Sequence, residues 1–309
     1  MSGQGKNIVV FGSTGQQGSA LINALSEYNT NNNNQSTGPN RFTVYALSRS
    51  PAAPSSIRLA SLSGVKVIEV AKDYMDEPLK ALEATGLAKG QIDGVFDVQG
   101  YVSEAIELKQ AKAIIDAAKE WEVEHFVYSS ADFGELDDTK IPPFEAKRQV
   151  ESYLRSSGVP YTILRPVQFL DNLLPSAPFQ MKVSRTVLLR LTFYNHPERK
   201  HQLVSCRDIG KFAALAFSDP AKWTGKEVSL AGDSLTREEV EKIYEEVTGK
   251  DVELTWSFLA RFVKLISPLG PMARFFDDHG YKVDIQQVRR DLPDLEDLRA
   301  FLRRYKATY

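Results

Sequence analysis

Three glycines near the start of the chain have the spacing of a phosphate-binding turn. Gly12, Gly15 and Gly18 follow four consecutive apolar residues at 8–11, which are typical of a buried strand, and precede a helical pattern. In such a unit the first glycine allows the tight turn, the second lets the backbone approach a pyrophosphate, and the third lets the helix pack on the strand. The positive end of the helix favours phosphate. The spacing predicts a dinucleotide site; a glycine-rich turn without a ligand is the alternative.

A guanidinium follows the second predicted strand. Residues 42–47 form an apolar run that ends in Ser48-Arg49-Ser50-Pro51, with no acid at the place where an NAD site binds the ribose 2′-hydroxyl. An arginine suits a 2′-phosphate, because its planar fork donates charge-assisted hydrogen bonds. Arg49 therefore favours NADP over NAD, and an ordinary exposed arginine is the alternative.

The rest of the first half must position these residues. Strands at 65–70, 94–98 and 125–128, and a sixth ending at Pro166, alternate with helices at 17–28, 79–87 and 103–121. This alternation predicts an α/β protein with a doubly wound parallel sheet, the NAD(P)-binding Rossmann fold. Ligands bind at the carboxyl ends of such strands. Asp73, the segment 99–101, Ser129 and Ser130 all fall at those ends, with the glycines and Arg49.

Composition excludes several classes of protein. The 309 residues include 38 basic and 40 acidic ones, so no charge excess favours direct binding to nucleic acid or to a membrane. Cys206 is the single cysteine, which excludes an intramolecular disulfide. We expect the polar leader not to act as a signal peptide, and no apolar run approaches the length of a membrane span. We therefore expect a protein of the cytoplasm or the nucleus.

From Pro143 onward the chain resembles the NmrA-like family of atypical short-chain dehydrogenase/reductases, which are related to isoflavone reductases. The resemblance rests on the segments 144–166, Phe169-Leu-Asp-Asn172 and Asp208-Ile-Gly-Lys-Phe-Ala-Ala-Leu-Ala216. With the glycine motif it covers most of the chain up to about Asp233. It implies binding of NADP(H). Some members are reductases, and others are redox sensors that bind partner proteins, including transcription factors.

The resemblance also implies where the cofactor lies. Residues 12–18 would hold the pyrophosphate, Arg49 the 2′-phosphate, and Lys147 the nicotinamide ribose. Asp73 and Tyr74 would lie near the adenine, with 99–101 beside the ribose and bridging phosphates and 169–172 beside the nicotinamide. The predicted cofactor residues are Gly12, Ser13, Thr14, Gly15, Gln16, Gln17, Gly18, Arg49, Asp73, Tyr74, Gln99, Gly100, Tyr101, Lys147, Phe169 and Asn172.

Lys147 is the candidate catalytic residue. It falls on the apolar arc of a helix that begins near Phe144, so it either contacts a ligand or pairs with Glu151 one turn on. Short-chain dehydrogenases use Tyr-x-x-x-Lys for proton transfer. Pro143 stands four residues before Lys147, and none of the twelve tyrosines has a lysine four residues later. Tyr101, Tyr128, Ser129 and Ser130 are the remaining hydroxyls nearby.

We expect a single NmrA-like domain over 1–309. Its cofactor core would comprise 6–170, with a disordered asparagine-rich insert at 29–40 and a return at 201–234. A smaller C-terminal α/β lobe for substrate or partner would comprise 171–200 and 235–309. Within the lobe we expect a strand at 186–193, a helix capped by Thr236 and Glu239, an apolar helix from Trp256 to Leu269 and a final helix at 295–305.

Two classes of function stay open. The lack of a Tyr-x-x-x-Lys pair favours a redox sensor that binds a regulatory protein according to cofactor state. The alternative is an NADPH-dependent reductase of a small carbonyl or quinone-like substrate that uses Lys147. The four histidines have no metal-ligand spacing, so we expect no metal, and we interpret Cys206 as a buried small residue. The protein would be a monomer or a homodimer.

Overall fold

The computed structural model describes residues 5–31, 41–100, 102–174, 196, 198–252 and 269–308. The chain forms two compact units, each built from separate stretches of sequence. The first unit comprises residues 1–130, 146–165 and 209–228, and the second comprises 131–145, 166–208 and 229–309. The division into a cofactor core and a substrate or partner lobe, with its functional borders, stays a prediction.

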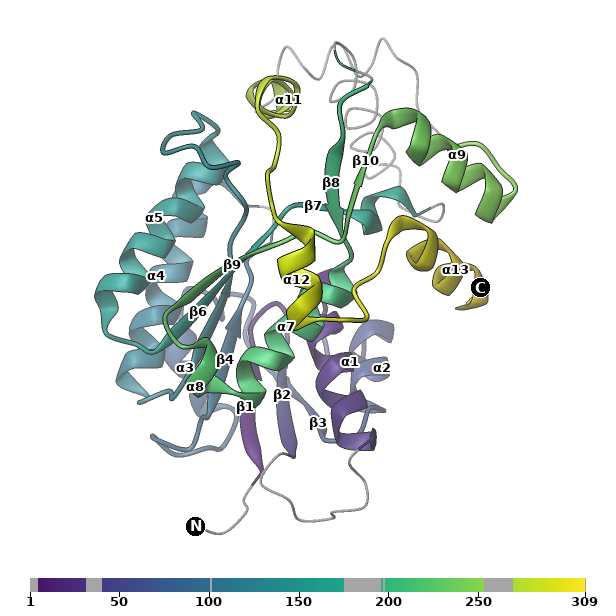
Figure 1. Cartoon of the computed structure of the whole chain (residues 1–309). Coiled ribbons are helices and arrows are strands. Elements are labelled where there is room, and N and C mark those ends of the chain that lie inside the picture. The colour runs from purple at the N-terminus through teal and green to yellow at the C-terminus, as the bar shows by residue number, and fades with distance from the viewer. Residues whose placement is uncertain are drawn as a thin grey trace. The chain divides into compact units, whose positions relative to one another are not determined.

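A seven-stranded sheet forms the centre of the first unit, in the order β3-β2-β1-β4-β5-β6-β9 (Figure 1). The registers from β3 to β6 are all parallel, which confirms the predicted doubly wound fold. β1 is flanked by β2 and β4, so the chain reverses direction across the sheet beside the glycine motif. The strands are β1 Lys6–Val10, β2 Phe42–Ser48, β3 Val65–Glu69, β4 Gly94–Asp97, β5 Phe126–Ser129, β6 Tyr161–Pro166 and β9 Lys226–Leu230.

Helices cover both faces of this sheet. In Figure 1, α3, α4 and α5 lie on one side of the strands, and α1 and α2 lie on the other. Apolar residues of the strands are buried on both faces, which explains why Ile8-Val9-Val10 of β1 and Val95-Phe96 of β4 are uninterrupted apolar stretches. The helices are α1 Gln16–Asn31, α2 Pro54–Ala60, α3 Pro78–Glu83, α4 Glu104–Glu120, α5 Pro142–Ser157, α7 Cys206–Ser218 and α8 Pro220–Trp223.

The start of the asparagine-rich insert was predicted wrongly. Residues 29–31 belong to α1, and Asn29 is buried. Its amide donates to the carbonyl of Phe42 at 2.9 Å and accepts from the N–H of Phe42 at 2.8 Å. Asn29 thus satisfies backbone groups at the start of β2, a role that composition could not reveal. Residues 32–40 lie outside the described part.

The second unit contains a three-stranded sheet in the order β10-β8-β7, formed by Asp233–Leu235, His201–Val204 and Gln168–Phe169. A 3₁₀ helix follows at Leu170–Leu173, and the later helices are α9 Arg237–Thr248, α11 Leu269–Asp278, α12 Ile285–Asp291 and α13 Leu298–Thr308. The predicted capping box of Thr236 and Glu239 is confirmed at the start of α9. The predicted strand at 186–193, and all but the last residue of the predicted apolar helix, lie outside the described residues. None of the described helices is long and apolar enough to cross a membrane.

Candidate functional site

The glycine turn is close-packed on one side and open on the other. Gly12 has φ +70°, and a Cβ there would lie 2.6 Å from the carbonyl oxygen of Val98. A Cβ on Gly18 would lie 2.3 Å from the carbonyl oxygen of Gly12, so only glycine lets α1 approach the turn this closely. Thr14, Gly15 and Gln16 are exposed. The start of α1, with N–H groups that lack partners within the helix, is therefore accessible to an anion.

Two side chains of the turn hold it to neighbouring strands. The Ser13 hydroxyl is buried and donates to the carbonyl of Leu47 at 2.6 Å. The Gln17 side-chain carbonyl accepts from the hydroxyl of Ser129 at 2.5 Å. These groups fix the glycine turn against the ends of β2 and β5. Whether Ser13 and Gln17 also contact a cofactor stays a prediction.

Arg49 and Tyr74 lie near the turn in different environments. Arg49 is exposed at the end of β2 and makes no hydrogen bond or ion pair with the part of the chain that the structure describes. The Tyr74 ring stacks on Phe11 with centroids 5.9 Å apart, and its Oη accepts from the N–H of Gly12 at 3.3 Å. Burial raises the pKa of Tyr74, which keeps the phenol neutral under the turn. Asp73 is exposed beside it.

A buried acid stands at the end of β4. Asp97 has no exposed surface, and the amide nitrogen of Gln99 donates to its two carboxylate oxygens at 2.9 and 3.1 Å. Burial raises the pKa of Asp97 to about 7. The side-chain oxygen of Gln99 is buried and has no partner in the described chain. Sequence reasoning missed Asp97, although an acid inside an otherwise apolar strand is the signal that could have found it. Gly100 is exposed, and Tyr101 lies outside the described residues.

Lys147 pairs with an acid that sequence reasoning did not single out. Its Nζ lies 2.7 Å from Oε1 of Glu107 on α4, and 5.6 Å from the centroid of the Tyr128 ring. The two side chains are 19% and 7% exposed, so this is a largely buried ion pair. Glu107 is buried on α4, as are Ala111 and Ile114, and its partner is 40 positions away. The periodicity of one helix does not reveal such a partner.

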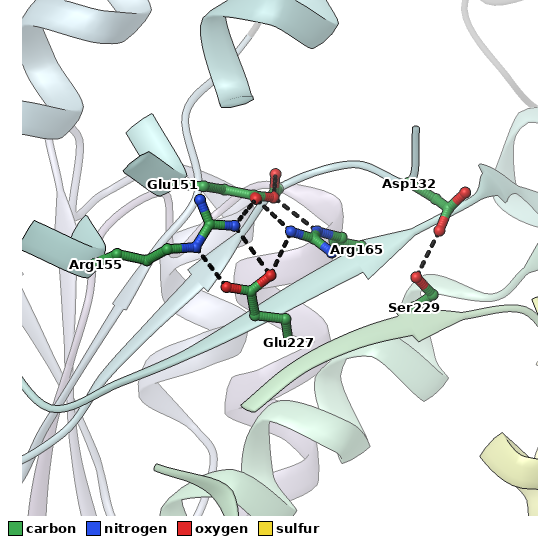
Figure 2. A network of polar contacts seen from close by, with 7 residues as sticks. Asp132, Glu151, Arg155, Arg165, Glu227 and Ser229 are labelled. Carbon is green, nitrogen blue, oxygen red and sulfur yellow. Dashed lines mark hydrogen bonds and ion pairs between the residues drawn. The ribbon is translucent and has the colours of Figure 1, made fainter. Parts of the chain in front are cut away.

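Glu151, the alternative partner for Lys147, belongs to another network, so that alternative was wrong. Figure 2 shows Glu151 facing two guanidinium groups, with Glu227 across from it. Glu151 is fully buried and accepts from Arg155 at 2.8 Å and from Arg165 at 2.5 and 2.9 Å. The Ser130 hydroxyl also donates to it, at 2.6 Å. Two acids and two arginines balance here, which compensates for burying Glu151.

The three hydroxyl groups at the end of β5 differ in whether they have a partner in the described chain. Ser129 donates to Gln17, and Ser130 donates to Glu151. The Tyr128 Oη is buried without a partner in the described chain, and burial, with the nearby acids, raises the pKa of Tyr128 well above its ordinary value. Within the described chain, the protons of Ser129 and Ser130 are thus engaged, and the Tyr128 hydroxyl is shielded from solvent.

The remaining predicted site residues lie in the second unit. Phe169 and Asn172 are half-buried in β7 and the 3₁₀ helix, and their contact with a nicotinamide stays a prediction. Cys206 is buried, as expected, and its N–H donates to Asp171 at 2.8 Å. Burial raises the pKa of Cys206 well above its ordinary value, which disfavours a reactive thiolate. Within the described residues, no group of three or more His, Cys, Asp or Glu could hold a metal ion.

The parallel sheet and the glycine turn define a dinucleotide-binding type of α/β fold. The chain belongs to the NmrA-like family, whose model matches residues 4–302. A curated relative from Aspergillus flavus, the NmrA-like family domain-containing oxidoreductase lnaB, is 26% identical over 305 residues, which cover 94% of this chain and 83% of the relative.

Two solved structures share the fold. NmrA, a negative transcriptional regulator in complex with NADP, has a TM-score of 0.66 at 17% identity and covers 97% of this chain and 95% of its own. The Citrobacter sp. triphenylmethane reductase complexed with NADP(H) has a TM-score of 0.67 at 19% identity, covering 96% of this chain and 99% of its own.

Proposed function

We propose that the chain binds NADP(H) at the strand ends of the first unit. The observation that carries this proposal is the open start of α1 together with the exposed, unpaired guanidinium of Arg49 at the end of β2 in the described part of the chain. The first suits a pyrophosphate, and the second suits a 2′-phosphate. The NADP complexes of the regulator NmrA and the triphenylmethane reductase support the same cofactor.

The role that the site favours is that of a redox sensor or regulator in the cytoplasm or the nucleus. Pro143 stands on α5 four residues before Lys147, where the catalytic tyrosine of short-chain dehydrogenases would stand. The hydroxyls of Ser129 and Ser130 are engaged, and that of Tyr128 is buried. Cofactor state would then be read by a protein partner, for which the second unit supplies the surface.

A reductase is the second candidate, and two observations favour it. Curated relatives with 24–27% identity are named oxidoreductases. Lys147, held by Glu107, keeps an ammonium group near Tyr128 of β5 and Asp97 of β4. In this case the Lys147 ammonium would donate the proton to the substrate oxygen while NADPH supplies the hydride to a small carbonyl or quinone-like substrate, and Lys147 would act as the base in the reverse reaction.

The two roles are separated by measuring binding and turnover on one preparation. NADPH is titrated calorimetrically, and its oxidation is then followed at saturating cofactor with a panel of aldehydes and quinones. A sensor binds NADPH and oxidises it no faster than a Gly15→Val control does. Substrate-dependent oxidation that the control lacks would establish the reductase. Failure to bind NADPH would contradict both roles.

A further inference from the structure

Asp97 and Gln99 form a pair whose orientation is fixed by chemistry. An ionised carboxylate can only accept hydrogen bonds, so the amide group that faces Asp97 must be the NH₂ group. The distances of 2.9 and 3.1 Å from the Gln99 nitrogen to the two oxygens agree with this. The side-chain oxygen of Gln99 must then face away from Asp97.

That oxygen is an acceptor without a donor in the described chain. Gln99 is 8% exposed, and its Oε1 has no partner in the part of the chain that the structure describes. A buried acceptor left unsatisfied is costly, and such groups in native proteins normally have a partner. The preceding residue, Val98, contacts the turn at Gly12, so Gln99 follows directly on the proposed phosphate site. A ligand hydroxyl group is the donor that this place suits.

We propose that Asp97 is a positioning residue that fixes the amide of Gln99, so that Gln99 Oε1 accepts a hydrogen bond from a hydroxyl group of the bound nucleotide. This inference rests on the proposed binding of NADP(H). The proposal gives a role to Asp97, a fully buried acid that makes no ion pair within the described chain. Asp97 itself would touch no cofactor atom.

The pair also makes binding depend on pH. Asp97 lies among Glu107 of α4, Tyr128 of β5, Lys147 of α5 and Tyr74, and burial raises its pKa to about 7. Below that pH, the protonated carboxyl can donate to Oε1 and the amide can turn its NH₂ group toward the ligand, so that the ligand hydroxyl must give up donating and accept instead. The ionised form therefore binds the hydroxyl better, and affinity should fall as the pH is lowered from 8 to 6.

The test is a double-mutant cycle with NADPH as the probe. An asparagine amide in place of the carboxylate can either accept from or donate to Gln99, so Asp97→Asn removes the fixed orientation without changing size. At pH 8 we expect Asp97→Asn to weaken NADPH binding about fivefold, the effect of one neutral hydrogen bond. Gln99→Met should do the same, and the double variant should be no weaker than Gln99→Met alone.

The pH profile supplies the readout that a purely structural role would not change. Wild type should lose more affinity between pH 8 and 6 than either variant, while titration of the cofactor phosphate affects all proteins alike. Equal effects of Asp97→Asn on NADPH affinity in wild type and in the Gln99→Met variant would overturn the inference.

If Asp97→Asn does not fold, the pH dependence of NADPH affinity in Gln99→Met decides. A dependence as steep as that of wild type overturns the inference, and a flatter one supports it. Wild type that binds no NADPH refutes the proposed function as well, whereas normal binding by every variant refutes only this inference.

Discussion

Arg49 should separate the two nicotinamide cofactors. Its guanidinium is exposed and unpaired within the described chain, so Arg49→Ala removes no hydrogen bond or ion pair there. A lost charge-assisted contact with the 2′-phosphate should weaken NADPH binding by about 1.5–3 kcal/mol and leave NADH binding nearly unchanged. Calorimetric titration measures both affinities, and Arg58→Ala on nearby α2 removes the same charge as a control. Equal losses for NADPH and NADH would refute this role of Arg49.

Substituting Lys147 should lower the stability of the protein as well as change its function, because Lys147 pairs with the buried Glu107. Lys147→Met keeps the stem but leaves Glu107 buried without its 2.7 Å partner. We expect the free energy of unfolding to fall by about 3–5 kcal/mol, the usual effect of breaking a buried pair. Adding Glu107→Gln should recover part of that loss, which urea denaturation can measure. A single variant as stable as wild type would indicate that the pair is open to solvent.

The same Lys147→Met variant distinguishes the two candidate functions. In a sensor, NADPH binding should weaken modestly, partner binding should change, and there is no turnover to lose. In a reductase, kcat should fall about a hundredfold, the typical contribution of a general acid or base, while affinity changes far less. Lys147→Arg, which keeps the charge, is the control. Unchanged affinity, turnover and partner binding would leave Lys147 with a purely structural role.

The sequence placed the glycine turn and Arg49 along the chain, but it did not identify which charged side chains pair in the fold. The glycine turn could be placed from the sequence because its spacing depends on backbone conformation, and Arg49 stands at the end of β2, where the strand pattern puts it. The cofactor contacts of both stay predictions. The partner of Lys147 could not be identified, because it depends on how α4 and α5 pack, and Glu107 lies 40 positions away. Asp97 was interpreted as part of an apolar strand, and only its burial in the folded sheet reveals an acid with an unusual pKa.

At the scale of one element, the glycine turn before α1 predicts different effects for substitutions at Gly15 and Gly18. A Cβ on Gly15 meets only the carbonyl of Gly12, at 3.3 Å, in the described chain, whereas one on Gly18 would lie 2.3 Å from it. Gly15→Val should therefore fold and lose NADPH binding, because its side chain occupies the space of the pyrophosphate. Gly18→Val should lose about 3 kcal/mol or more of stability, as overpacked sites do. Thermal unfolding and NADPH titration of both variants test this pair. A Gly15→Val protein that binds normally would place the phosphate site elsewhere.

Elements with a strong apolar pattern were predicted to within a few residues. β1 to β6, α4 and the capped start of α9 follow from local patterns that agree with their packing. The helix α2 was not predicted, since seven residues give too little periodicity. The end of α1 was misplaced because asparagine composition indicates a loop, while the buried contacts of Asn29 with Phe42 depend on tertiary structure.

His125 should contribute to the pH dependence of stability of the whole molecule. The ring is buried between Thr162, 2.8 Å from Nε2, and Thr224, 3.2 Å from Nδ1, and burial lowers its pKa to about 4. The unfolded chain then binds more protons between about pH 6.5 and 4, so stability falls as the pH is lowered through this range. From about pH 7.5 to 5, wild type should lose about 2 kcal/mol more than a His125→Gln variant. Urea denaturation at the two pH values measures the difference, and parallel losses would contradict it.

Titration of NADPH into the intact protein tests the central claim most directly, because every proposed role requires this cofactor. Isothermal calorimetry of wild type and Gly15→Val, each with NADPH and NADH, keeps the fold constant while the phosphate site is closed. We predict that wild type binds NADPH more tightly than NADH and that Gly15→Val binds neither. Wild type that binds neither cofactor, or a folded Gly15→Val protein with the affinity of wild type, would contradict the account.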